Sequence, residues 1–369
     1  MRAASLLVVT LLAFFAGGRA ADAKGPAPKE VHGAIQRAAD WLKARHAKGF
    51  ESGTKHSTPE IVLYTLLHTS TKRDDPVYEA ALKETLSTEL AYTYRVATMA
   101  MALAKLNPYV YRARIAHCAQ WLVDSQLPGG EWGYPGNVVG RTQSTFALKS
   151  KPTVTDDEAK GGPKAEQIVI TRKVDALKFA GAKGDFSNTQ YALLGLYACR
   201  EARIQIPKET WEAALGYHAK YQQEDGSWGY VMKGEQDEAG YASLTAAGTV
   251  GAALCVFGMG KKNPKSHPVV KKGLKWLQKR WTPEENAHLD QSAIIPPSTW
   301  QYYHLYAVER VGRILNIKKI GKRKWYEEGA GWILENQRSD GSWKDPGGDT
   351  TAEDPPYLHT AATCFAILF

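Results

Sequence analysis

Cysteines are few in this chain of 369 residues, and their placement argues against a disulfide framework. Cys118, Cys199, Cys255 and Cys364 stand singly inside apolar patterns of helical type, and no Cys-x-x-Cys spacing occurs. Domains held together by disulfides or zinc carry their cysteines in regular sets. We therefore expect four buried free thiols.

Long apolar runs are also missing. The main one, residues 6–16, is about 11 residues long, whereas a membrane-spanning helix needs about 20. It follows Arg2 and precedes a group of small residues that ends at Ala23, which is the pattern of a secretory signal peptide over residues 1–23. We expect an exported protein, periplasmic or extracellular, with residues 24–30 as a spacer and a single domain over residues 31–369.

Acidic residues are outnumbered by basic ones, 38 against 47, for a formal net charge of +9. The basic residues lie on helix flanks and turns, among them Lys261 to Lys272 and Lys318 to Lys324, as on a solvated surface. No aromatic residues are interleaved with them in the manner of nucleic-acid-binding motifs. We expect no nucleic-acid partner, while binding to an acidic surface or glycan stays open.

One spacing occurs three times: an aromatic residue, four residues, Gln, three residues, Gly, one residue, Trp. The copies are Trp121/Gln126/Gly130/Trp132, Tyr217/Gln222/Gly226/Trp228 and Trp332/Gln337/Gly341/Trp343. At this composition, a given Gln is followed by this Gly and Trp in roughly one of 400 trials, so the chain is built from repeats. In each copy the aromatic residue falls in a helix, Gly ends that helix in a left-handed conformation, and Trp packs back. We interpret the Gln, Gly and Trp residues as structural.

The three strings WLVDSQLPGGEW, YHAKYQQEDGSW and WILENQRSDGSW resemble the QW repeat of the squalene cyclase and protein prenyltransferase superfamily. Weaker copies stand at residues 272–277, where Trp281 takes the Gln position, and at residues 38–42. Together the copies cover nearly the whole chain after the signal segment. The resemblance implies a barrel of paired helices.

Helical periodicity supports the same architecture independently. Runs rich in small residues begin near Pro59, Ala91, Ser187, Tyr241, Ser298 and Tyr357, and larger amphipathic runs begin near Val31, Pro76, Pro108, Pro207, His267 and Arg323. Small residues permit close helix packing, so the first set should form an inner ring and the second an outer ring. Because the chain opens with an outer-type helix and stops in an inner-type helix, its two ends can complete each other. We predict an all-α, closed (α/α)6 toroid, with insertions at about 134–186 and 281–297 shaping one rim.

The two chemistries of the resembled superfamily can be tested residue by residue. Class II terpenoid cyclases carry an Asp-x-Asp-Asp-Thr-Ala segment at an inner helix, where the middle Asp protonates an alkene. Thr245 and Thr360 precede an Ala here but lack the acids, and the acidic run 156–158 has Val154 at the first Asp position. Protein prenyltransferases bind zinc through Asp, Cys and a distant His; His359 resembles the last of these, and no Asp-x-Cys accompanies it. We expect neither a metal nor a cofactor.

Polar and aromatic residues at the heads of the inner-type helices are the candidate site residues. The candidates for catalysis are Asp349, His359, Asp185 and Tyr241, and those for ligand binding are Asn188, Gln190, Trp300, Tyr303 and His304. Asp185 or Ser187 also suits a helix N-cap. An aromatic-lined cavity suits either a polyprenyl chain or stacked sugar rings.

Two hypotheses follow. The first is an exported binding module that takes an apolar, isoprenoid-like or extended ligand in the toroid, without class II cyclase chemistry; a protein partner is a further option. The second is a divergent enzyme, either a terpenoid cyclase-like isomerase or a carbohydrate-active α/α barrel, hydrolase or lyase. An enzyme requires several titratable groups with shifted pKa values to converge in one pocket, and a binding module does not.

Overall fold

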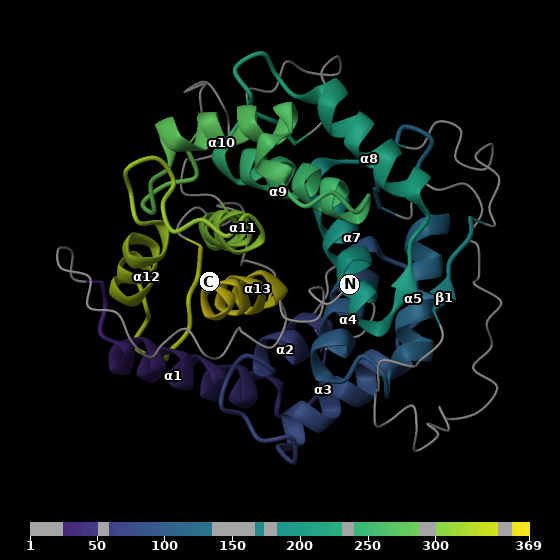
Figure 1. Ribbon diagram of the computed structural model, residues 1–369. Coiled ribbons are helices and arrows are strands. Elements are labelled where there is room, and N and C mark those ends of the chain that lie inside the picture. Colours follow the sequence, from purple (N-terminus) through teal and green to yellow (C-terminus); the bar gives the residue numbers. More distant parts are fainter. Residues whose placement is uncertain are drawn as a thin grey trace.

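The computed structural model describes residues 25–50, 59–134, 167–172, 183–230, 240–287, 300–345 and 356–369. Within these residues, twelve α-helices form two concentric rings, as Figure 1 shows along the axis of the toroid. The inner helices are α2 (Pro59–Leu66), α4 (Thr93–Leu106), α7 (Phe186–Cys199), α9 (Ala242–Gly258), α11 (Gln301–Ile314) and α13 (Pro356–Leu368). The outer helices are α1 (Pro28–His46), α3 (Pro76–Ser87), α5 (Arg112–Asp124), α8 (Lys208–Tyr221), α10 (Pro268–Arg280) and α12 (Trp325–Glu335).

The inner ring is closed. Each inner helix contacts the next one along the chain, and α13 contacts α2. Small residues make this packing close, because a side chain at Gly195 of α7 would place its Cβ 2.7 Å from the Cα of Ala97 in α4. Helix α9 is buried on every side from Ala242 to Val256, as expected for an apolar helix enclosed by neighbours. The predicted (α/α)6 toroid is confirmed.

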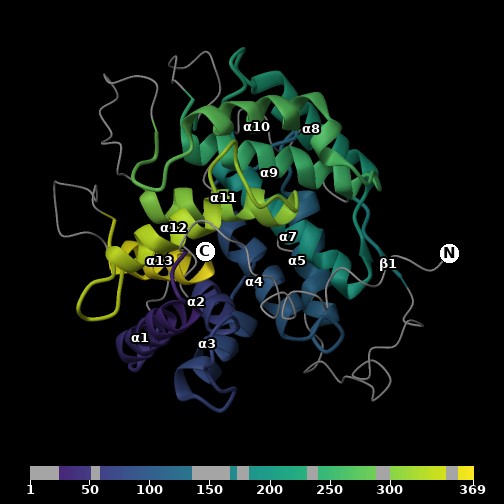
Figure 2. The same ribbon diagram turned by 60° about the vertical axis from the view of Figure 1, so that its left-hand side comes forward.

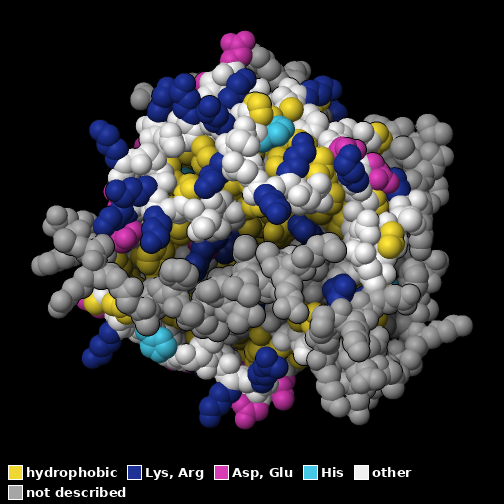
Figure 3. Space-filling view, in the orientation of Figure 1, with side chains coloured by type: hydrophobic (Ala, Val, Ile, Leu, Met, Phe, Trp, Pro, Cys, Tyr) yellow, Lys and Arg dark blue, Asp and Glu magenta, His cyan; other side chains and the backbone are white. Residues whose placement is uncertain are grey.

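The outer helices bury one face each. In α10 the buried residues Val269, Val270, Gly273, Trp276 and Leu277 recur at helical spacing, and the remaining face is rich in lysine. Figure 3 shows Lys and Arg side chains spread over the end of the toroid that faces the viewer and over its outer wall. The outer helices thus separate the apolar inner ring from solvent.

The three Gln-Gly-Trp turns have one common geometry, which joins α5 to α8, α8 to α10 and α12 to α1. In the first copy, Gln126 Nε2 donates to Gly130 O at 2.9 Å and to Thr210 O of α8 at 2.9 Å. Gly130 has φ of 100° and lies against the Ala213 carbonyl, where a Cβ would come within 2.2 Å. Trp132 Nε1 donates back to the helix that it follows. These residues are structural, as the spacing predicted.

The third copy closes the toroid. Gln337 Nε2 donates to Gly341 O and, at 2.9 Å, to Ala34 O of α1, so the last outer helix is joined to the first by the same turn. Helix α13 also contacts α1, and the two views in Figures 1 and 2 both place α1, α12 and α13 together. The outer-type start and the inner-type end of the chain therefore complete each other as predicted.

The described part of the first insertion departs from the expected place at a rim. Its strand is β1 (Ile168–Val169), which pairs in parallel with β2 (Ile204–Gln205) just after α7. Residues 167–172 then run along α5, because Gln120 Nε2 donates to Thr171 O and Arg172 donates to Gln126 O. This segment lies on the outer wall because its backbone finds partners there.

All four cysteines are free and buried, which confirms that expectation. Burial raises the pKa of Cys118 to about 12, so this thiol stays protonated. No helix among the described residues combines the length and the apolar character that crossing a bilayer requires.

Candidate functional site

Three of the four candidate catalytic residues occupy the same position in different repeats. The backbone N–H of each turn Trp donates to a threonine of an inner helix, namely Thr189, Thr245 or Thr363. Four residues before these threonines stand Asp185, Tyr241 and His359. They therefore lie at the N-terminal end of the inner ring, here called the mouth. The fourth candidate, Asp349, lies outside the described residues.

Asp185 is the N-cap of α7 and is buried. Its carboxylate accepts hydrogen bonds from Asn188 N and from Asn188 Nδ2, both at 2.7 Å. Burial raises the pKa of Asp185 to about 6, and the hydrogen bonds from Asn188 offset that effect in part. The carboxyl is thus both a helix cap and a group that changes charge just below neutral pH.

Tyr303 of α11 joins the same cluster from the other side of the inner ring. Its hydroxyl lies 2.8 Å from Ser187 Oγ and donates to Gln190 Oε1 at 3.0 Å. The structure thus brings together four residues predicted from the sequence: Asp185, Asn188, Gln190 and Tyr303. These four and Ser187 are here called the mouth cluster. Residues more than a hundred positions apart in the chain meet because the toroid places α7 and α11 around one axis.

Two amide atoms of the mouth cluster have no hydrogen-bond partner among the described residues. Asn188 Oδ1 offers an acceptor and Gln190 Nε2 offers a donor, and both side chains are fully buried. Buried polar atoms are nearly always paired in folded proteins, with protein groups, water or a ligand. A bound molecule with its own donor and acceptor would satisfy both atoms.

Tyrosine rings surround the cluster. Tyr94 packs edge-on against Tyr191, with ring centroids 4.8 Å apart, and lies 6.0 Å from Tyr134. Burial raises the pKa values of Tyr94, Tyr134 and Tyr303, and the Asp185 charge raises them further. Their hydroxyls stay protonated and available as hydrogen-bond donors, beside apolar ring faces.

His359 and Tyr241 have different surroundings from Asp185. The His359 ring packs on Trp41 of α1 with centroids 4.6 Å apart, and its Nε2 lies 2.9 Å from Ser342 Oγ. Burial lowers the pKa of His359, so the ring is neutral and helps to close the toroid. Tyr241 is the N-cap residue of α9, and its backbone N–H donates to Trp228 O. Burial raises the pKa of Tyr230, and electrostatic interactions with Asp185 and Tyr241 raise it further.

The other two aromatic candidates do not join the mouth cluster. His304 is buried against Trp281, with ring centroids 5.5 Å apart, and its Nε2 lies 3.4 Å from Thr282 O. Trp300 precedes α11 with φ of 58° and is 44% exposed. Because α11 has aromatic residues on all its faces, some of them point toward the toroid axis and others toward the outer ring. The sequence pattern does not show which aromatic residue points in which direction.

The sequence pattern identified Ser187 only as a possible helix N-cap and did not reveal the spacing that contains it. Counted back from Thr189, the segment Asp-Phe-Ser-Asn-Thr has the spacing of the cyclase segment Asp-x-Asp-Asp-Thr, with Ser187 at the protonating acid and Asn188 at the third acid. The cyclase segment continues with Thr-Ala, whereas Gln190 follows Thr189 here, so a Thr-Ala match does not identify this position. In the last repeat the equivalent threonine is Thr363, while Thr360 binds Arg45.

Glu131 is a second buried carboxyl near the mouth and was also missed. It directly precedes the turn Trp, and burial raises its pKa. A Cβ at Gly184, next to Asp185, would come within 2.4 Å of its side chain. The charges of Glu131 and Asp185 both raise the pKa of Tyr217. Two carboxyls with raised pKa values therefore lie on the same side of the toroid.

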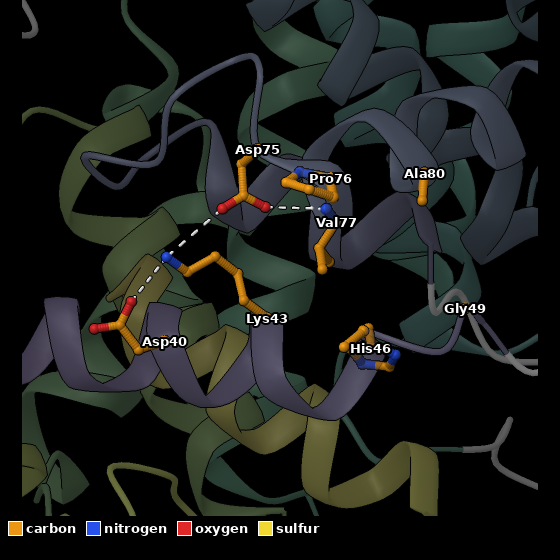
Figure 4. A pocket seen from close by; sticks show the side chains of 9 residues that line it. Asp40, Lys43, His46, Gly49, Asp75, Pro76, Val77 and Ala80 are labelled. Carbon is orange, nitrogen blue, oxygen red and sulfur yellow. Dashed lines mark hydrogen bonds and ion pairs between the residues drawn. The ribbon is translucent and has the colours of Figure 1, made fainter.

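A separate pocket of about 440 Å³ lies between α1 and α3. Figure 4 shows Lys43 reaching from α1 toward two carboxylates, Asp40 at 2.8 Å and Asp75 at 3.7 Å. His46, which stands at the Gln position of the weak repeat copy, lines it as well. Burial lowers the pKa of His46 to about 4, so its imidazole ring is neutral at pH 7 beside the charged Lys43 and its two carboxylates.

No group of three or more His, Cys, Asp or Glu side chains in the described part of the chain is arranged to hold a metal ion. The mouth cluster instead offers one carboxyl, two amides and several hydroxyls. Such a set can orient a ligand by hydrogen bonds and can exchange one proton near pH 6.

Fold and site together define an α/α toroid with a tyrosine-lined mouth. The sequence matches no protein-family model and no curated protein. The structure is similar to the type II terpene cyclase MstE from Scytonema without ligand, at 14% identity and a TM-score of 0.51 over 92% of this chain and 96% of that chain. It is equally similar to an MstE variant in complex with geranylgeranyl dihydroxybenzoate, at 15% identity and a TM-score of 0.51 over 92% of this chain and 95% of that chain.

It is also similar to a possible member of the GH105 family from Salmonella enterica, at 11% identity and a TM-score of 0.55 over 94% of each chain. At these identities the likeness establishes the fold alone, which terpene cyclases share with glycoside hydrolase barrels.

Proposed function

We propose that this protein is an exported binding toroid that takes an apolar, isoprenoid-like or otherwise extended ligand at its mouth and lacks class II cyclase chemistry. The observation that carries the proposal is the pair of buried, unpartnered amide atoms, Asn188 Oδ1 and Gln190 Nε2. Ligand sites are mostly apolar and use a few placed polar groups to fix orientation. The tyrosine faces provide the apolar lining, and the amides provide the polar groups.

The mouth cluster supports binding over alkene protonation. The position of the protonating acid holds Ser187, whose hydroxyl is engaged by Tyr303. The remaining acid, Asp185, accepts two hydrogen bonds from Asn188 as a helix cap. An acid that protonates carbon must be backed by further acids, and here an amide takes that place.

The ligand test uses the mature protein purified from its own host, with native mass spectrometry after lipid extraction. A co-purified apolar ligand, recovered chemically unchanged, supports the proposal. Squalene and geranylgeraniol then serve as probes for direct binding. An empty protein that binds neither probe contradicts the proposal, and sequencing of the mature N-terminus tests export by cleavage before residue 24.

A matched pair of variants locates the ligand. Tyr303→Phe removes the hydroxyl that joins Ser187 and Gln190, and we expect ligand affinity to fall about tenfold. Tyr302→Phe is the control, since that ring packs on Trp332 in the outer ring. Equal affinities of the two variants would show that the ligand lies elsewhere.

A second candidate function rests on a different observation. Asp185 has a pKa of about 6, and the pKa of the neighbouring Glu131 is also raised. Two such carboxyls are what a carbohydrate-active barrel needs for acid-base chemistry. Turnover of a glycan that falls as pH rises above 6, and that Asp185→Asn abolishes, would favour this function over the binding module.

A further inference from the structure

The outer wall at α10 carries a continuous group of exposed lysines, here called the lysine wall. Its members are Lys261, Lys262 and Lys265 around the 3-10 turn Pro264–Ser266, Lys271, Lys272, Lys275 and Lys279 on α10, and Lys318, Lys319 and Lys322 before α12. The two stretches that supply them, residues 259–283 and 310–326, contain no Asp or Glu.

The turn before α12 lies directly against α10, which makes the wall continuous. A Cβ at Gly321 would come within 2.9 Å of Gln278 O, and Arg323 Nη1 donates to Trp281 O at 3.0 Å. Figure 3 shows the basic side chains gathered over the region that Figure 1 labels α10 and α12. Lysines from two successive helix pairs therefore share one surface.

None of the ten lysines forms an ion pair within the described residues, whereas Lys208 of α8 pairs with Glu212 at 2.6 Å. A carboxylate does lie against α10, because Asp225 Oδ2 accepts a hydrogen bond from Trp276 Nε1 at 2.8 Å. Within α10, like charges at Lys271, Lys275 and Lys279 repel at one-turn spacing, and Lys271 lies near the positive end of the helix dipole. The arrangement costs helix stability, so an external anion is the natural partner.

We propose that the lysine wall binds an acidic polysaccharide. The large exposed apolar residues of the described chain are Val169 and Trp300, and neither belongs to the wall. A protein interface would have an apolar, lysine-poor centre, a membrane-inserting surface would carry apolar anchors, and a single-stranded nucleic acid would need aromatic platforms. The wall has none of these.

Its shape supports the same partner. The wall follows the convex outer circumference of the toroid, so a flat bilayer would meet few of its lysines at once. A flexible polymer can follow the curve. Lysines four residues apart lie about 6 Å apart along the α10 axis, so regularly spaced anionic groups can meet them in turn. The site is separate from the mouth and does not depend on the function proposed for it.

The probe is polygalacturonate, with neutral dextran as the uncharged polymer, and binding to the mature protein is measured by fluorescence anisotropy across a salt series. We expect binding to polygalacturonate alone, with affinity falling steeply as salt rises. The triple variant Lys271→Gln, Lys275→Gln and Lys279→Gln should bind about tenfold more weakly. Its melting temperature should not fall, because repulsion within α10 is relieved.

The control variant removes the same charge elsewhere: Lys48→Gln, Lys83→Gln and Lys105→Gln, all at exposed positions outside the wall. It should bind like the unmodified protein. Equal losses in the two triple variants would overturn the proposal, because net charge alone would then explain binding. Tighter binding to duplex DNA or to phosphatidylglycerol vesicles than to polygalacturonate would also overturn it.

Discussion

Gly341→Ala tests whether the toroid is closed by the third Gln-Gly-Trp turn. Gly341 has φ of 90°, and a Cβ there would come within 2.8 Å of the backbone oxygen of Arg37 in α1. The left-handed conformation costs an L-residue about 1 to 2 kcal/mol, and the overlap with backbone atoms adds a similar amount. We expect the free energy of unfolding to fall by about 2 to 4 kcal/mol.

Urea unfolding followed by tryptophan fluorescence measures this change, and hydrogen exchange should show faster opening of α1. Gly331→Ala, within the α12 helix that precedes this turn, is the matched control, because its Cβ would meet nothing within 4 Å. That substitution should stabilise the protein by about 0.5 to 1 kcal/mol, as for Gly to Ala in a helix. Equal stabilities of the two variants would refute the proposed closure.

Two further predictions concern pH. Asp185 is protonated more readily in the folded protein, with a pKa of about 6 against 3.8, so stability should fall by about 3 kcal/mol as pH rises from 4 to 6. Asp185→Asn should remove that fall in urea titrations at several pH values; an unchanged slope contradicts it. His46 has a folded pKa of about 4 against 6.5, so its contribution is lost as pH falls from 6.5 to 4, by about 3 kcal/mol. His46→Gln should abolish this acid-dependent loss, and a persisting loss would point to another group.

The ring architecture was predictable because its signals are local and repeated. Helix α13 was expected to begin near Tyr357 and begins at Pro356, and α10 was expected near His267 and begins at Pro268. The left-handed conformation of turn residues such as Gly341 could be predicted, because glycine adopts positive φ angles without steric cost. The closure of the ring followed from the phase of its two ends.

The mouth cluster was predictable only in part. Asp185, Asn188 and Gln190 share one stretch of sequence, and a helix start could be recognised there. The hydrogen bonds from Tyr303 depend instead on the angle at which α11 faces α7, which no local pattern encodes. For the same reason, no local pattern shows that His304, a ligand-binding candidate, packs against Trp281.

The position shared by Asp185, Tyr241 and His359 became visible when the hydrogen bonds aligned the repeats. Each residue precedes by four the threonine that binds a turn Trp. The Thr-Ala pair of the last repeat points to Thr360, three residues before Thr363, which binds the turn Trp. A residue that receives a backbone N–H is a better guide to repeat phase than a dipeptide match.

The contacts that join neighbouring outer helices can be compared with the position of the pocket between α1 and α3. The turns join α5 to α8, α8 to α10 and α12 to α1, and Gly321 and Arg323 provide a substitute joint between α10 and α12. Between α1 and α3 the Gln position holds His46, which stacks on Phe50 at 4.7 Å instead of binding the next helix. The pocket in Figure 4 lies at this joint. The Gln position that does not bind the next outer helix thus coincides with a local opening between α1 and α3.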